Sequence, residues 1–280
     1  MIKTALRLGR VSNLPTVWTN ALAGAVLAGA SAPGPVLLTA LVLTLFYIGG
    51  MWLNDAFDAE IDRQQRANRP IPQGEISART VFAVGFAMLA LGLVLILPLG
   101  YAAVLVGLSL VVAIILYDWL HKTTVLAPLI MGATRFLSYA LAAYAAAQVF
   151  PPEALWGALG LFAYVIGLTY AAKQEAFDRL ERAWPLGVLA IPCAIALWSA
   201  TQNALALPVA LAFLAVVVMA LRGLFRRGAG DVPRAVVLMI AGIALYDAAL
   251  MAGKGAVLPA GLAIAAFVLT RWFQRIVPGT

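Results

Sequence analysis

Residues 36–74 read VLLTALVLTLFYIGGMWLNDAFDAEIDRQQRANRPIPQG, an apolar stretch that ends in a run of acidic and basic residues. Its first part, Val36–Leu53, approaches the ~20 apolar residues that a helix needs to cross a bilayer. Its second part, Asn54–Gly74, contains four acidic residues and three arginines. Charged clusters are costly beside lipid and usually serve a function there. The stretch therefore predicts a membrane-spanning helix that leads into a functional site.

Apolar runs of similar length recur along the whole chain, in which 64% of residues are hydrophobic and 11% are charged. This pattern predicts an all-α, multi-pass transmembrane helical bundle. Without a long linker, residues 1–280 are expected to form a single integral-membrane domain. The candidate spans are Leu14–Ala30, Val36–Leu53, Thr80–Leu97, Ala102–Leu116, Leu129–Val149, Leu155–Ala172, Pro185–Ala200, Leu205–Leu221, Val236–Ala252 and Leu258–Thr270.

Basic residues cluster in alternate loops, and the intervening loops are short and almost uncharged. Lysine and arginine near span ends are held on the cytoplasmic side of a membrane. We therefore expect a cytoplasmic amino terminus and active site, in a protein of the bacterial inner (plasma) membrane. The net charge of +7 follows from this topology and from attraction to anionic lipids or substrates. No basic soluble domain is visible that would bind nucleic acid.

The acidic residues after the second span have the spacing of one helical face. Asn54, Asp58 and Asp62 follow one another at intervals of four, and Asp55 lies close to the same face. Unpaired carboxylates in this arrangement would repel one another, so a cation must compensate them. Mg²⁺ fits best because it binds through a few carboxylates together with water and phosphate oxygens. These four residues are the predicted metal ligands.

The arginines that follow complete the predicted site. Arg66 and Arg69 lie in or next to a proline-rich turn, and guanidinium groups match phosphate oxygens in a bidentate geometry. The alternative is that this acidic and basic loop is only a solvated cap. The regular spacing of the acids favours a site that binds metal and phosphate.

The pattern NDxxDxxxD followed by RxxRPxPxG resembles the first signature of the UbiA superfamily of intramembrane prenyltransferases. The resemblance extends along nearly the whole chain in span number and loop positions. It implies a helical bundle, usually of nine spans, around a central cavity. It also implies two Mg²⁺ ions that bind an isoprenyl diphosphate under a cytoplasmic cap. Our ten candidate spans are one more than this family usually has.

A second acidic signature of the family, DxxxD, is altered in this chain. The corresponding stretch is Lys173-Gln174-Glu175-Ala176-Phe177-Asp178, with glutamine in the place of the first aspartate. The resemblance implies Asp178 as a metal ligand and Glu175 as a substitute ligand. A helix-end ion pair between Glu175 and Arg179 is the alternative.

Tyr117-Asp118-Trp119-Leu120-His121-Lys122 resembles the tyrosine-then-basic stretch of the family, with histidine where lysine is common. The resemblance implies a diphosphate contact for Lys122 and a substrate contact for Tyr117. Together with the acidic motif, it implies Asp58, Asp62, Arg66 and Lys122 as catalytic residues. Substrate-binding roles are expected for Asn54, Arg66, Arg69, Lys122, Arg135, Asn13 and Tyr117.

Polar residues inside the spans have two interpretations each. Arg135 interrupts an apolar segment, either to bind substrate or to reach lipid headgroups. Asn13 and Asn20 are seven residues apart and share a helical face, which indicates a cavity wall or a contact between helices. Asp247 either lines an acceptor cavity or bonds a neighbouring helix.

The resemblance implies Mg²⁺-dependent transfer of an isoprenyl group from an isoprenyl diphosphate to an aromatic or other lipophilic acceptor. Two alternatives are a transporter or flippase whose acids bind a coupling ion, and a relative that binds isoprenoid lipids without transferring them. Transporters place charged residues near the bilayer midplane on broken helices, whereas most acids here lie at span ends. This placement favours the transferase. The acceptor, the prenyl chain length and the oligomeric state stay open.

Overall fold

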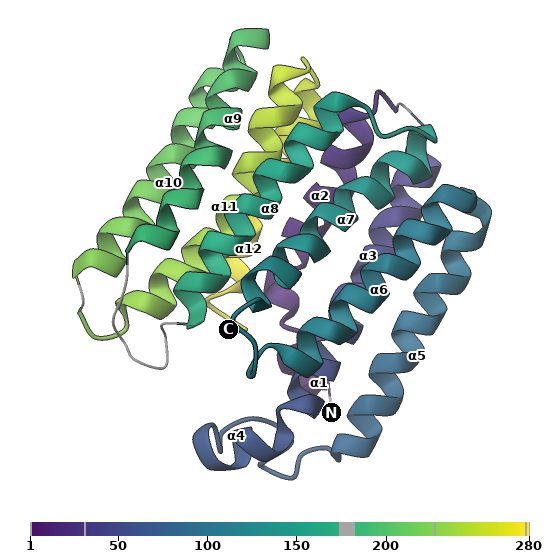
Figure 1. The fold of residues 1–280 in the computed structure, drawn as a ribbon, viewed down its shortest axis with the longest axis vertical. Coiled ribbons are helices and arrows are strands. Elements are labelled where there is room, and N and C mark those ends of the chain that lie inside the picture. The colour runs from purple at the N-terminus through teal and green to yellow at the C-terminus, as the bar shows by residue number, and fades with distance from the viewer. Residues whose placement is uncertain (1, 31, 174–182, 227, 278, 280) are drawn as a thin grey trace.

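A computed structural model describes residues 2–30, 32–173, 183–226, 228–277 and 279. Those residues contain helices and no strand (Figure 1). The elements are α1 (Ile2–Leu8), η1 (Val11–Asn13), α2 (Leu14–Leu27), α3 (Pro33–Phe57), α4 (Ala59–Gln65), α5 (Ala78–Ile96), η2 (Leu97–Leu99), α6 (Tyr101–Leu120), α7 (Ala127–Ala147), α8 (Pro152–Lys173), η4 (Trp184–Leu189), α9 (Ala190–Gln202), α10 (Ala206–Arg226), α11 (Asp231–Gly253) and α12 (Val257–Phe273).

Each predicted span coincides largely with one helix, except Pro185–Ala200, which covers η4 and α9. In the described part of the chain, eight helical segments are long and apolar enough to cross a membrane. The remaining two spans are shorter, since α2 has 14 residues and α12 has 17. The outer faces of the bundle expose large apolar side chains such as Leu91, Leu108, Leu211 and Leu262, as lipid-facing helices do. The protein is therefore an integral membrane protein, with a span count close to the predicted nine to ten.

The helices begin and end where the sequence provides the signals. The side chain of Ser77 accepts a hydrogen bond from the Thr80 amide and caps α5. Proline occupies the first turns of α3 and α7, where the missing N–H is not needed. Gly100 separates η2 from α6 with a φ of 99°, a conformation that side chains disfavour. These signals fix the lengths of the spans.

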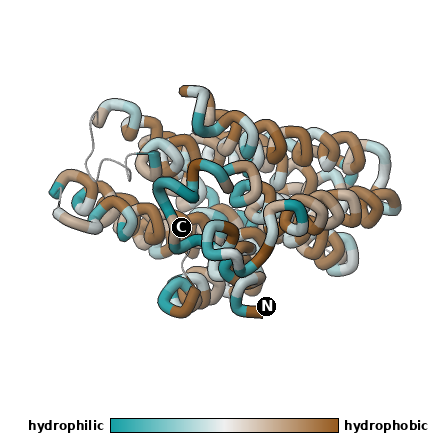
Figure 2. The backbone as a smooth tube through the Cα atoms, turned by 90° about the horizontal axis from the view of Figure 1, so that it is seen from below, coloured by the Kyte–Doolittle hydropathy of each residue, from teal (hydrophilic) through white to brown (hydrophobic). Residues whose placement is uncertain are grey.

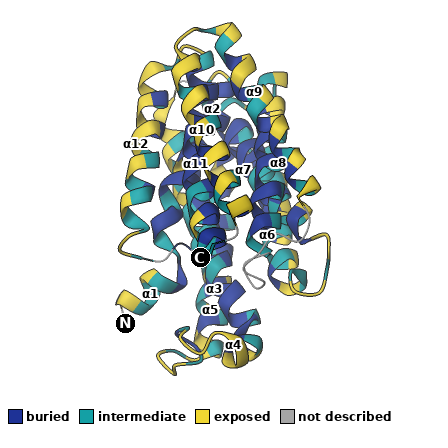
Figure 3. Cartoon of the chain, turned by 90° about the vertical axis from the view of Figure 1, so that its left-hand side faces the viewer, coloured by how far each residue is buried: buried dark blue, intermediate teal, exposed yellow. Residues whose placement is uncertain are grey.

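The centre of the bundle is formed by α2, α7, α8 and α11, whose residues are the most buried (Figure 3). Helix α2 packs against α3, α7, α11 and α12. A Cβ atom at Gly24 of α2 would lie 2.7 Å from the carbonyl oxygen of Tyr139 in α7, so glycine is what lets these two helices approach.

One end of the bundle carries the polar segments. Helices α1 and α4 and both ends of the described chain lie toward this end (Figures 1 and 3). Seen from that side, hydrophilic stretches of backbone lie in front of the largely apolar helices (Figure 2). The Asn54–Gly74 segment is therefore a cap at the end of the spans, as predicted.

Candidate active site

The predicted acidic ligands come together at the junction of α3 and α4. Asn54 and Asp55 lie in the last turn of α3, and Asp62 lies in α4. The spacing predicts one continuous helical face, but α3 ends at Phe57 and Asp58 separates it from α4. All four side chains are nevertheless buried, with Asp62 only 2% exposed. Buried carboxylates need compensating charges.

Two arginines compensate Asp55 and Asp62. Arg69, in the loop after α4, donates a hydrogen bond from Nη1 to Asp55 Oδ1 and brings Nε to 3.6 Å from Asp62 Oδ2. Arg10 Nη2 lies 3.4 Å from both Asp55 Oδ1 and Asn54 Oδ1. Arg10 is in the left-handed region with a φ of 41°, which side chains rarely adopt. The turn between α1 and η1 thus brings a second basic group to the cluster.

Asp58 is compensated from the other side of the site. His121 Nε2 and Lys122 Nζ, just after α6, each lie 3.3 Å from Asp58 Oδ2. Burial raises the pKa of Asp58, but the hydrogen bond and charge of His121, with Lys122, outweigh it and hold the pKa below its usual value. Burial raises the pKa of Asp62, and the opposing charge of Arg69 does not cancel this rise. The two carboxylates therefore differ in how readily they ionise.

The donor set of the cluster fits a hard divalent cation. It offers carboxylate and amide oxygens, the ligands that Mg²⁺ prefers, and the buried Asp62 Oδ2 accepts no hydrogen bond from the part of the chain that the structure describes. In the described residues, no three acidic, histidine or cysteine side chains converge on a single point. The carboxylates pair with arginine and lysine instead.

The other predicted residues are distributed around this cluster. Arg66 ends α4 and is exposed. Tyr117 stacks on His121 with a ring-centre separation of 5.1 Å. Asn13 donates to the Gly279 carbonyl oxygen at 2.9 Å and accepts from Gln274, so it bonds the carboxyl-terminal segment and not the acids. The predicted ligands Glu175 and Asp178 lie outside the described residues.

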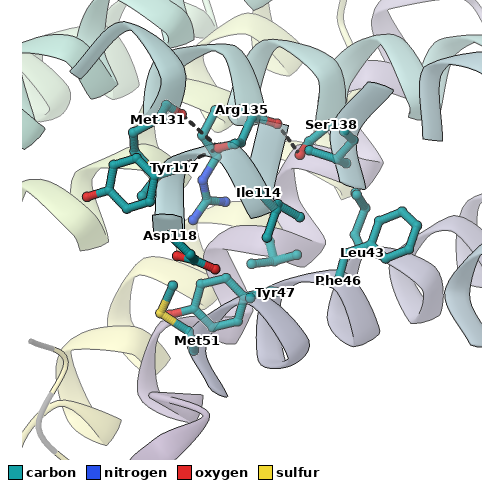
Figure 4. A pocket seen from close by; sticks show the side chains of 14 residues that line it. Leu43, Phe46, Tyr47, Met51, Ile114, Tyr117, Asp118, Met131, Arg135 and Ser138 are labelled. Atoms are coloured by element: carbon teal, nitrogen blue, oxygen red, sulfur yellow. Dashed lines mark hydrogen bonds between the residues drawn. The ribbon is translucent and has the colours of Figure 1, made fainter. Parts of the chain in front are cut away.

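A cavity lies between α2, α3, α6 and α7 beside the cluster. Its polar lining residues include Tyr47, Tyr117, Asp118 and Arg135, and its apolar ones include Leu43, Phe46 and Ile114 (Figure 4). Asn54 Nδ2 donates to Asp118 Oδ1 at 3.1 Å, so the acidic cluster and the cavity share a hydrogen bond. The arrangement provides an apolar chamber next to a charged, oxygen-rich end.

Arg135 lies on the cavity wall and belongs to a buried polar chain. Its Nη1 donates to Asn20 Oδ1 at 2.7 Å, and Asn20 Nδ2 donates to Asp247 Oδ2 at 2.7 Å. The Tyr139 hydroxyl donates to Asp247 Oδ1 at 2.5 Å. Of the two interpretations of Asp247, the contacts show the bond to neighbouring helices, since Asn20 and Tyr139 belong to α2 and α7.

Sequence reasoning did not assign Arg10 or Asp118 to the site. Arg10 was counted only among the basic residues that indicate membrane topology, and Asp118 only among the acids at span ends. Both reach the cluster through contacts with residues more than forty positions away. For Asp118 the sequence does contain a signal, because it is an acidic residue at the end of an apolar span, next to Tyr117.

Comparison with known proteins supports the resemblance to the UbiA superfamily. A sequence profile of the UbiA prenyltransferase family matches residues 16–183. The digeranylgeranylglyceryl phosphate synthase of Methanopyrus kandleri is 31% identical over 214 residues, which are 74% of this chain and 77% of that one. The synthase of the same name from Metallosphaera sedula is 33% identical over 136 residues. That match spans about half the length of the Metallosphaera protein, 48%.

Solved structures show the same fold at low sequence identity. The apo structure of a UbiA homolog from Aeropyrum pernix has a TM-score of 0.72 at 18% identity, covering 86% of this chain and 98% of that one. A UbiA homolog from Archaeoglobus fulgidus bound to GPP and Mg²⁺ has a TM-score of 0.54 at 16% identity, covering 95% and 99%. At these identities the likeness concerns the fold alone.

Proposed function

The chain belongs to the UbiA prenyltransferase family, and from this we propose that it transfers an isoprenyl group from an isoprenyl diphosphate to a lipophilic acceptor within the membrane. One observation carries the proposal. The buried cluster of Asn54, Asp55, Asp58 and Asp62, with its basic partners, adjoins an apolar cavity and shares a hydrogen bond with it through Asp118. A charged end for a diphosphate and an apolar chamber for its tail are what this reaction requires.

We propose that Asn54, Asp55, Asp58 and Asp62 hold Mg²⁺, with Glu175 and Asp178 as further ligands. The carboxylate and amide oxygens support this assignment, as does Asp62 Oδ2, which accepts no hydrogen bond from the described residues. The Archaeoglobus fulgidus homolog of the same fold was solved with GPP and Mg²⁺. When bound, the ion supplies charge neutralisation for a departing diphosphate.

The basic residues are assigned to the diphosphate. Arg66 is exposed and is available to phosphate oxygens. Arg69 and Lys122 pair with the carboxylates, and we propose that they turn to phosphate oxygens when substrate binds. Their charges then offset the negative charge that develops as the bond between the isoprenyl carbon and the diphosphate oxygen breaks.

The cavity is assigned to the isoprenyl tail and the acceptor. Leu43, Phe46, Leu110 and Ile114 give it an apolar wall that excludes water, which would otherwise capture the allylic cation. The nucleophilic atom of the acceptor then forms a bond to the isoprenyl carbon, and the acceptor releases the proton that this atom carried. Because relatives are named digeranylgeranylglyceryl phosphate synthases, geranylgeranylglyceryl phosphate is the first acceptor to test.

We also propose that the protein lies in the inner membrane of a bacterial cell, with the cluster and the amino terminus on the cytoplasmic side. The concentration of basic residues in the cap and in the alternate loops supports this orientation.

The test is binding of radiolabelled geranylgeranyl diphosphate to the purified protein, with and without Mg²⁺. Binding should require Mg²⁺ and should be lost in Asp58→Ala. Glu60→Ala is the matched control, because Glu60 lies two residues away with its side chain 74% exposed. Release of diphosphate on addition of acceptor then separates a transferase from a lipid-binding relative. Mg²⁺-independent binding, or equal binding by Asp58→Ala, would refute the proposed site.

A further inference from the structure

The segment after α12 folds back onto η1, just before α2. Gln274 directly follows α12, and its Nε2 donates to Asn13 Oδ1 at 3.1 Å and to the Val237 carbonyl oxygen at 3.1 Å. Gly279 is buried, and its carbonyl oxygen accepts a hydrogen bond from Asn13 Nδ2 at 2.9 Å. Seen from the polar end, this end of the chain lies in front of the bundle and not beside it (Figure 2). Gln274 and Gly279 therefore hold one buried asparagine between them.

Asn13 links this segment to the cavity wall. Its side chain is buried, and Nδ2 also lies 3.4 Å from the hydroxyl oxygen of Tyr47, a residue that lines the cavity. A side-chain amide has two N–H donors on one side and a carbonyl oxygen on the other. Because Oδ1 accepts from Gln274, the amide nitrogen of Asn13 faces the opposite side. Its two hydrogens serve the Gly279 carbonyl oxygen and the Tyr47 hydroxyl, so the hydroxyl keeps its own hydrogen for another acceptor.

That acceptor is the backbone of Arg10. The Tyr47 hydroxyl donates to the Arg10 carbonyl oxygen at 3.3 Å. Arg10 has a φ of 41°, a conformation that a residue with a side chain keeps only where its surroundings impose it. From this turn, Arg10 Nη2 lies 3.4 Å from both Asn54 Oδ1 and Asp55 Oδ1. The hydrogen bonds thus run in one direction, from the carboxyl-terminal segment to the arginine that contacts the acidic cluster.

We propose that the carboxyl-terminal segment, through Gln274 and Gly279, is a positioning element that fixes Arg10 against the acidic cluster. This inference rests on the proposed function, in which Arg10 is a positive charge beside the residues assigned to Mg²⁺ and diphosphate. Both residues of the segment act through Asn13 and Tyr47, and not by contact with substrate. If the direction of these hydrogen bonds is reversed, the Arg10 turn loses the bond that fixes its carbonyl group.

The first variant is Gln274→Glu, which keeps the shape of the side chain but cannot donate to Asn13 Oδ1. Asn13 must then turn its nitrogen toward residue 274, so its oxygen competes with the Arg10 carbonyl for the Tyr47 hydrogen. We expect Mg²⁺-dependent binding of geranylgeranyl diphosphate to weaken about tenfold, the effect of losing one hydrogen bond to a charged group. Gln202→Glu, at the exposed end of α9, is the matched control and should bind as the wild type does. Wild-type affinity in Gln274→Glu would overturn the inference.

A double-mutant cycle separates positioning from packing. Tyr47→Phe keeps the ring but removes the hydroxyl, so it should weaken diphosphate binding about tenfold by itself. Adding Gln274→Glu to Tyr47→Phe should then weaken it no further, because the hydroxyl through which the segment acts is already gone. Losses that multiply to about a hundredfold would show that the segment acts by another route and would refute the inference. So would wild-type affinity in Tyr47→Phe alone.

Gly279→Val tests the same chain without adding a charge. A Cβ atom at Gly279 would lie 3.0 Å from Asn13 Oδ1, so valine should displace the segment from Asn13. It should weaken diphosphate binding in the wild type and not in Tyr47→Phe. This second cycle decides the question where Gln274→Glu does not fold.

Affinity is expressed per folded protein, and thermal unfolding in detergent is measured on the same preparations. A lower unfolding temperature with wild-type affinity in both segment variants would assign the segment to packing alone. The wild type separates the two failures. Absent Mg²⁺-dependent diphosphate binding refutes the proposed function, whereas normal binding in the wild type and unchanged affinity in the variants refute this inference alone.

Discussion

Asn54 donates a hydrogen bond from Nδ2 to Asp118 Oδ1 at 3.1 Å, and this contact joins the ends of α3 and α6. Both side chains are buried, and Asp118 Oδ2 has no hydrogen-bond partner within the part of the chain that the structure describes. Because the amide nitrogen faces Asp118, the amide oxygen of Asn54 faces Arg10 and the acidic cluster. Asp118 therefore orients a predicted metal ligand.

Replacing Asp118 should test this orienting contact. Asp118→Ala leaves a buried amide donor without its acceptor, which should cost about 1–3 kcal/mol in the free energy of unfolding and weaken Mg²⁺-dependent diphosphate binding. Asp118→Asn keeps an acceptor oxygen and should retain most of both properties. Thermal unfolding in detergent measures the first effect. Ser109→Ala, on the exposed face of the same helix, is the control. Identical unfolding of Asp118→Ala and Ser109→Ala would rule out the contact.

The two arginines of the proline-rich segment should behave differently. Arg69 pairs with the buried Asp55 and Asp62, so Arg69→Ala should lower the free energy of unfolding by roughly 3 kcal/mol. Arg66 is exposed, so Arg66→Ala should change it by less than about 0.5 kcal/mol.

Both arginine variants should bind geranylgeranyl diphosphate about tenfold more weakly if both arginines contact phosphate. Unfolding and binding are therefore measured on the same preparations. Arg63→Ala provides the control, because Arg63 pairs only with the exposed Glu60 among the described residues. Full diphosphate affinity in Arg66→Ala would remove that residue from the proposed site.

The raised pKa of Asp62 predicts an unusual pH dependence. Burial makes the folded protein bind the Asp62 proton more tightly than the unfolded chain does. The resulting stabilisation is present at low pH and is lost as the pH rises through the folded pKa. Without Mg²⁺, Asp62→Asn should therefore be more stable than wild type at about pH 7, and the difference should shrink toward about pH 4.

Magnesium should reverse that difference, because it stabilises only a chain that can bind it. The measurement is the unfolding temperature as a function of pH, for wild type and for Asp62→Asn, each with and without Mg²⁺. A wild type that is more stable than Asp62→Asn at neutral pH without Mg²⁺ would contradict the raised pKa. The exposed Glu60→Gln change should leave the curves unaltered.

The fold was accessible from the sequence because membrane spans leave a local signal. Runs such as Val36–Leu53 and Leu155–Ala172 are apolar over the length that a bilayer requires, and each lies on one helix. The positions at which a helix is interrupted were harder to predict from the sequence. The spacing of Asn54, Asp58 and Asp62 indicates a continuous helix, whereas the chain interrupts it at Asp58, where Lys122 and His121 contact the carboxylate.

The candidate site was accessible only where its residues are close in sequence. Asp55, Asp58 and Asp62 form a motif within eight residues. All three side chains are buried, and Arg69 contacts both Asp55 and Asp62. Arg10, Asp118 and Asp247 contact residues on other helices, and a local sequence pattern does not predict such contacts. The shared face of Asn13 and Asn20 predicted either a cavity wall or a contact between helices. Asn13 bonds Gly279, Gln274 and the hydroxyl of Tyr47, which lines the cavity.

The close approach of α2 and α7 gives a last prediction, since both helices line the cavity. A Cβ atom at Gly24 would lie 2.7 Å from the Tyr139 carbonyl oxygen and 2.8 Å from Ala142 Cβ, which are backbone or short side-chain atoms that cannot turn away. Gly24→Ala should therefore push the helices apart and lower the free energy of unfolding by roughly 1–3 kcal/mol. Because Tyr139 also bonds Asp247, the shift should loosen the chain that holds Arg135.

Gly261→Ala is the matched control for Gly24→Ala. Gly261 also lies inside a helix, α12, but a Cβ atom there meets nothing within 4 Å. Alanine should then raise helix stability by up to about 1 kcal/mol. Thermal unfolding of the two variants should thus shift in opposite directions. If Gly24→Ala unfolds at the wild-type temperature, α2 and α7 do not pack as closely as described, and the wall that carries Arg135 must be drawn differently.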